Sequence, residues 1–181
     1  MVNFLFAKHW QLFLLMIGIS VIGDILTPLS VLTIISMGAF LAWLWAVAIL
    51  LQSKVPQNVK MKTLKFKLFF FVPLIYVPWA FYSISNHSVH NDAKTGIDLF
   101  ITPVVICLHL FTMFCVFYCM YFAAKTVRTI ELQRKVVIDD FSTVFLMIWF
   151  FPIGIWILQP RINRNYAKFN ALTSGKRWQS L

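Results

Sequence analysis

Residues 141–163 read FSTVFLMIWFFPIGIWILQPRIN, an apolar stretch that Pro152 and Gly154 divide into two parts. At about 1.5 Å per residue, neither part is long enough to cross the roughly 30 Å hydrocarbon core of a bilayer. Basic residues lie on both sides of the stretch: Arg134, Lys135, Arg161 and Arg164. Because a crossing segment does not keep positive charge at both ends, we predict a re-entrant hairpin over residues 141–160. It turns at Pro152 and Gly154 and returns to the side from which it entered.

The composition is that of a membrane protein. Of the 181 residues, 60% are hydrophobic and 12% are charged, and the mean hydropathy is +0.80. Soluble domains carry about 25% charged residues, so we predict an all-α integral membrane protein. The net charge of +10 comes mostly from basic loops between apolar runs. That placement favours contact with the anionic lipids of a cytoplasmic leaflet over binding of nucleic acid.

Four apolar runs predict four transmembrane helices, over residues 10–24, 31–52, 68–84 and 99–122. A cytoplasmic amphipathic helix at 123–140, the hairpin at 141–160 and a basic interfacial tail at 161–181 complete the predicted architecture. Pro73 and Pro78 predict a kink in the third span. The first run has some features of a signal peptide, but no A-x-A cleavage site follows it, so we interpret it as a span.

The basic residues predict the orientation of the spans. With both termini in the cytoplasm, every Lys and Arg except Lys94 falls on the cytoplasmic side, which is the bias that the positive-inside rule describes. Full crossing by the hairpin would move the C-terminal basic residues outside. The charge distribution therefore favours a hairpin that does not cross.

Gly38, Ala42 and Ala46 recur at intervals of four in the second span. On a helix they form one smooth ridge that lets a neighbouring backbone approach closely. The ridge predicts either packing within the chain or an interface between copies in an oligomer.

His109 lies near the middle of the fourth span, with Thr102 and Thr112 on roughly the same face. An ionisable group at that depth is costly and points to function, although a neutral imidazole can also serve as a hydrogen-bonding group at a helix contact. Asp24 is a boundary residue if the first span ends at Gly23. If that span runs to Leu29, Asp24 becomes an intramembrane carboxylate, and we expect it to pair with His109 in a proton or cation site.

Patterns for metals, cofactors and catalysis are weak. The cysteines lie in one apolar run, which excludes a disulfide framework and favours packing over a metal site; they are Cys107, Cys115 and Cys119. An outer loop carries further residues of the types that bind metal ions, namely His87, His90, Asp92 and Asp98. Their spacing favours an ordinary solvated loop over a metal site. No known catalytic motif is present. We expect Asp139 and Asp140 to stand at a helix start, where carboxylates are favourable.

Residues 151–163, FPIGIWILQPRIN, resemble a signature of short, uncharacterised polytopic inner-membrane proteins of Bacteroidota. The resemblance implies a bacterial inner membrane and carries no activity. On physical grounds, we expect Trp156 to anchor the hairpin at the interface and Pro160 to end it.

These patterns predict a non-enzymatic protein that self-assembles into a channel or pore-like oligomer through the small-residue ridge and the hairpin. Re-entrant backbone is tolerated at membrane depth only where protein buries it or where it lines a water-filled cavity. An accessory subunit of a larger inner-membrane complex is the alternative. A lipid-modifying enzyme is a third interpretation, for which the interfacial candidates are Asp139, Asp140, Gln159 and Asn163.

Overall fold

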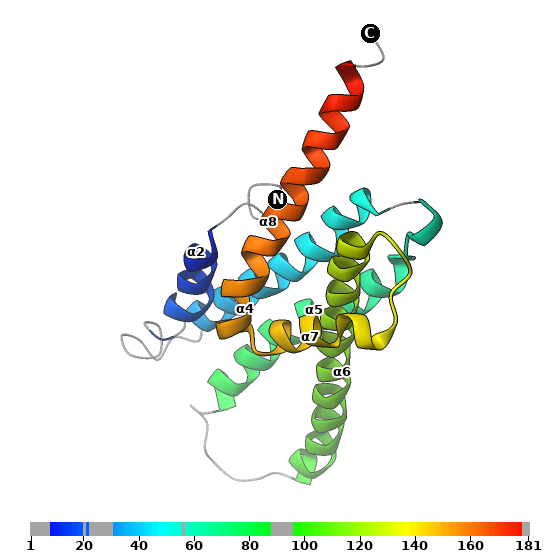
Figure 1. The fold of residues 1–181 in the computed structure, drawn as a ribbon. Coiled ribbons are helices and arrows are strands. Elements are labelled where there is room, and N and C mark those ends of the chain that lie inside the picture. Colours follow the sequence, from blue (N-terminus) through cyan, green and yellow to red (C-terminus); the bar gives the residue numbers. More distant parts are fainter. Residues whose placement is uncertain (1–7, 20, 22–30, 56, 88–95, 179–181) are drawn as a thin grey trace.

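A computed structural model describes the chain except residues 1–7, 20, 22–30, 56, 88–95 and 179–181 (Figure 1). The described residues form helices and connecting turns without a strand. The longer helices are α4 (Val31–Trp45), α5 (Leu64–His87), α6 (Gly96–Leu132), α7 (Ile138–Trp149) and α8 (Phe151–Trp178). The shorter elements are α2 (His9–Phe13), the π-helical turns η1 (Leu14–Gly18) and η2 (Ala46–Leu50), and the 3₁₀ turns η3 (Leu51–Lys54) and η4 (Gln57–Val59).

Three helical segments are long and apolar enough to span a membrane: Leu32–Leu50, Leu64–Ser83 and Thr102–Leu132. They correspond to the second, third and fourth predicted spans, so the prediction of a helical membrane protein is confirmed. Of the first predicted span, the apolar helix His9–Gly18 is described and is shorter than a membrane crossing. Its remaining part, including Asp24, lies mostly outside the described residues.

The buried core gathers at one end of the bundle, where α4, α6, α7 and α8 converge. The largest fully buried side chains come from all of these helices and from the start of α5; they include Trp43, Leu44, Phe66, Val127, Ile148 and Leu158. Farther from this core, α5 and α6 contact each other through pairs such as Phe69–Phe114 and Tyr76–His109. Most side chains of residues 102–111 on α6 are exposed, although nearly all of them are apolar. This distribution is the one expected for helices surrounded by lipid.

The predicted division of the chain at residues 122 and 123 is wrong. Helix α6 continues through it to Leu132, because Ala123 and Ala124 are fully buried in the core and leave no break in the helix. The helix stops at Gln133, whose φ of 52° lies in the left-handed region. The predicted amphipathic helix at 123–140 is therefore split between the end of α6, a loop and the start of α7.

Two helices meet in the stretch for which a hairpin is predicted. Helix α7 ends at Trp149 and α8 begins at Phe151, so the chain turns at Phe150 and not at Pro152. Pro152 occupies the first turn of α8, where its missing N–H is not needed. The two backbones approach closely at Gly154, where an added Cβ would lie 2.8 Å from Met147 Cα and closer still to its carbonyl.

Pro160 does not end the hairpin, contrary to the prediction. Helix α8 runs through it to Trp178, because Leu158, Gln159 and Ile162 on both sides of the proline are buried against the other helices. The predicted tail at 161–181 is thus largely the second half of α8. In Figure 1 this half projects beyond the bundle.

Candidate functional site

A cluster of charged side chains joins α6 to α8 at the core end of the bundle. Glu131 accepts hydrogen bonds from Arg128 Nη1 at 2.6 Å and from Asn165 Nδ2 at 3.4 Å. Glu131 also forms an ion pair with Arg161, whose Nε lies 3.6 Å from Glu131 Oε1. The Glu131 side chain is only 13% exposed, so these partners stabilise a carboxylate that is largely withdrawn from water.

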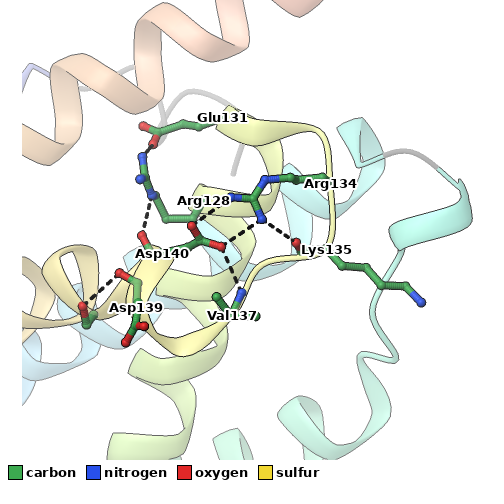
Figure 2. A network of polar contacts seen from close by, with 8 residues as sticks. Arg128, Glu131, Arg134, Lys135, Val137, Asp139 and Asp140 are labelled. Carbon is green, nitrogen blue, oxygen red and sulfur yellow. Dashed lines mark hydrogen bonds and ion pairs between the residues drawn. The ribbon is translucent and has the colours of Figure 1, made fainter.

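The loop between α6 and α7 is fixed by a second carboxylate (Figure 2). The Asp140 carboxylate accepts hydrogen bonds from both terminal nitrogens of Arg134, at 3.0 and 3.1 Å. It also accepts one from the Val137 N–H at 3.0 Å. The Val137 N–H and then Arg134 lower the pKa of Asp140 from its usual value. Arg128 Nε also donates to the Asp140 backbone carbonyl at 2.7 Å. Asp139 and Asp140 lie in the first turn of α7, as the sequence predicts.

Buried amides connect the helices inside the core. Trp43 Nε1 donates to Gln159 Oε1 at 3.0 Å, and Gln159 Nε2 donates to Asn163 at 3.3 Å. Gln52 Nε2 donates to Thr126 Oγ1 at 3.1 Å. Gln159, a sequence candidate for lipid chemistry, therefore joins α8 to α4, and Asn163, another candidate, bonds to Gln159 within α8. The sequence signal for such contacts was an amide within an otherwise apolar segment.

His109 is exposed on α6, and its partner is one that the sequence did not reveal. Tyr76 Oη of α5 lies 3.3 Å from His109 Nδ1, and the Tyr76 side chain is buried. Thr112 is buried and donates to the Leu108 carbonyl of its own helix, whereas Thr102 is exposed. The structure thus pairs His109 with a tyrosine across helices. The suggested Asp24–His109 pair involves a residue outside the described part of the chain.

The small-residue ridge, which runs from α4 into η2, is divided between two environments. Ala46 is 1% exposed and packs in the core. Gly38 and Ala42 are exposed, and a Cβ added to Gly38 would meet no atom within 4 Å. One end of the ridge packs within the chain, and the other is open to a neighbour.

The described residues contain no group of three or more side chains that could hold a metal ion. Cys115 and Cys119 are free and buried, and Cys107 is free and exposed. The outer-loop candidates His90 and Asp92 lie outside the described residues, as do the side chains of His87 and Asp98.

No protein-family model matches the chain, and no curated protein or solved structure matches it.

Proposed function

We propose that this chain is a small integral membrane protein that self-assembles into a channel or pore-like oligomer and is not an enzyme. The observation that carries the proposal is the exposed imidazole of His109. The nearest charged residues along the helix, Asp98 and Lys125, are about 16 Å and about 24 Å away at 1.5 Å per residue. His109 therefore lies within a few ångströms of the middle of a hydrocarbon core about 30 Å thick.

Lipid chains cannot satisfy an imidazole at this depth. Tyr76 engages Nδ1, and Nε2 has no partner among the described residues. The side chains around it are apolar and exposed; they include Ile106, Leu108, Leu110, Phe111 and Met113. Exposure of a polar group to hydrocarbon is unfavourable by roughly 2 kcal/mol or more. A neighbouring copy of the chain, or water in a lumen between copies, would supply the missing hydrogen bond.

The open end of the α4 ridge supports assembly independently. Exposed Gly38 and Ala42 present a smooth surface without a Cβ at its centre. Surfaces of this kind let transmembrane helices approach closely, and close approach is the main source of attraction between helices in lipid.

A re-entrant hairpin formed by α7 and α8 is part of the proposal. The exposed side of α8 is apolar at Ile153 and Ile157 and basic at Arg164 and Lys168. If the membrane boundary lies near Pro160, the turn at Phe150 is about 15 Å deep, which is half of the hydrocarbon core. That depth supports a hairpin that enters from the cytoplasmic side. We include four spans and cytoplasmic termini in the proposal because of the charge distribution. We include a bacterial inner membrane because of the resemblance of residues 151–163 to inner-membrane proteins.

An accessory subunit of a larger complex is the second candidate. The observation that favours it is the second half of α8, which projects beyond the bundle and offers a partner a long helical arm (Figure 1). A lipid-modifying enzyme receives less support, because Asp140 and Gln159 are both committed to contacts within the chain.

The test begins with the native mass of the complex extracted gently from its own membranes. A homogeneous multiple of 21.1 kDa, with ion flux after reconstitution into liposomes, is the expected result. His109→Phe keeps an aromatic ring but removes the hydrogen bonds, so it should abolish the flux or the assembly, whereas His109→Gln should retain more of both. Met113→Leu, at another exposed position of α6, is the matched control.

A monomeric mass without flux would contradict the proposal, as would a His109→Phe protein that behaves like the control. Co-purification with larger proteins at a fixed ratio would instead identify an accessory subunit. The α4 interface is tested separately by the Gly38→Ile/Ala42→Ile double variant. An unchanged native mass in that variant would rule this surface out.

A further inference from the structure

One side of α8 changes from apolar to basic along its length. Ile153 and Ile157 are 72% and 48% exposed, and Pro160, Arg164 and Lys168 are also exposed. At about 100° per residue, these five positions fall within about 80° of one another around the helix. They form a single continuous face, which we name the α8 outer face.

The basic half of the α8 outer face has a fixed neighbour. Arg161 lies at the edge of this basic half, with its side chain 33% exposed. The Arg161 Nε forms an ion pair with Glu131 of α6. Arg128 contacts the same carboxylate at 2.6 Å, so Glu131 is already neutralised by two guanidinium groups. Arg164 and Lys168 have no ion-pair partner in the part of the chain that the structure describes. The local charge is thus strongly positive.

The spacing of the two halves fits the profile of one membrane leaflet. Ile157 and Arg164 are about 10 Å apart along the helix, and the headgroup layer on each side of the hydrocarbon core is about 5–8 Å thick. Isoleucine at 157 can therefore contact acyl chains while the guanidinium at 164 is level with the phosphates. Trp156 is 47% exposed beside this boundary, where tryptophan is enriched.

We propose that the α8 outer face binds an anionic phospholipid of the cytoplasmic leaflet. An acyl chain lies along Ile153 and Ile157, and the phosphate is held by Arg164 and Lys168 with Arg161 beside them. The inference depends on the membrane depth assigned above to the hairpin, and not on self-assembly. A diffuse attraction of basic residues to the leaflet would give no preference for this helix. The combination of apolar and basic halves on one face is what makes the site specific.

The test is a titration of the detergent-purified full-length protein with phosphatidylglycerol, in which native mass spectrometry counts bound lipid. Arg164→Gln/Lys168→Gln removes two positive charges from the face. Each basic residue near an anionic lipid contributes roughly fivefold in affinity, so binding should weaken about 25-fold. The matched control is Lys60→Gln/Lys62→Gln, which removes two exposed charges from another basic segment and should change the affinity less than about twofold.

Two further experiments distinguish a lipid from free phosphate as the ligand and test the role of the apolar half of the face. Excess inorganic phosphate should not displace phosphatidylglycerol, and phosphatidylcholine should bind more weakly without distinguishing the two double variants. Ile157→Asn keeps every charge and should still weaken phosphatidylglycerol binding several-fold. Equal losses in both double variants, displacement by free phosphate, or an unaffected Ile157→Asn protein would each overturn the inference. Native mass and flux measured on the same samples test the oligomer separately, since Arg164 and Lys168 lie away from His109.

Discussion

Replacing Gly154 with alanine should open the contact between α7 and α8. The added Cβ would lie 2.8 Å from Met147 Cα and closer still to the Met147 carbonyl carbon and oxygen. These are backbone atoms of the neighbouring helix, so no side-chain rotation relieves the overlap. The hairpin would have to separate at the point where α8 has just begun, one turn after Phe150.

The magnitude follows from two opposing effects. Alanine is favoured over glycine inside a helix by about 1 kcal/mol, which would stabilise the variant if space were available. Forcing extra atoms into a packed site costs about 1–3 kcal/mol, and rigid backbone neighbours place Gly154→Ala at the upper end. We expect a net loss of about 2 kcal/mol. At about 2–4 °C per kcal/mol for a chain of this size, the melting temperature should fall by about 4–8 °C.

The assay is thermal unfolding in a mild detergent, followed by circular dichroism, with Gly18→Ala as the matched control. Gly18 is also helical, but a Cβ there meets only side-chain atoms of Leu14, at 3.4 Å and beyond. The control should therefore be neutral or more stable than the wild type by up to about 1 kcal/mol. A Gly154→Ala protein with the same melting temperature as the control would refute the close approach of the two backbones.

Three other changes test the polar contacts. Glu131→Gln removes the carboxylate that faces Arg161 and should cost about 1 kcal/mol; an unchanged melting temperature would show that this ion pair contributes nothing. Gln159→Leu leaves the buried Trp43 N–H without an acceptor and should cost about 1–3 kcal/mol, and adding Trp43→Phe should recover part of that loss. The pKa of Asp140 is lowered by a backbone N–H and a guanidinium, so its stabilising effect is present above the ordinary carboxyl pKa and is lost as the pH falls through the lowered value. Unfolding midpoints should therefore drop below about pH 4, and a titration of Asp140→Asn that shows the same drop would contradict this assignment.

Much of the candidate site was accessible from the sequence, but its partners were not. His109 was identified as an ionisable residue in the middle of a span, and the structure leaves it exposed there. Its contact with Tyr76 joins residues 33 positions apart, and periodicity on one helix gives no information about a neighbouring helix. The ridge on α4 and η2 shows the same limit, because spacing alone did not reveal that Ala46 is buried and Gly38 is exposed.

At two helix boundaries, tertiary packing overrode the local sequence signals for where a helix ends. Pro160 was expected to stop a helix, since proline removes a backbone donor and crowds the preceding turn. Buried neighbours on both sides of it keep α8 continuous. In the same way, the change from apolar to mixed composition after residue 122 did not end α6, because Ala123, Ala124 and Val127 all pack in the core.

By itself, the sequence determined that this is a helical membrane protein, where its apolar runs lie, and which residues are costly at membrane depth. Those properties follow from hydropathy and charge summed along short segments. Each segment that enters lipid must satisfy its backbone hydrogen bonds internally, so these properties do not depend on contacts with distant segments. Only the tertiary structure decided that Gln159 bonds to Trp43, 116 positions away, that Glu131 joins α6 to α8, and that Gly154 meets the backbone of Met147. Each of these contacts depends on the relative placement of two helices, which side-chain packing fixes and no single segment encodes.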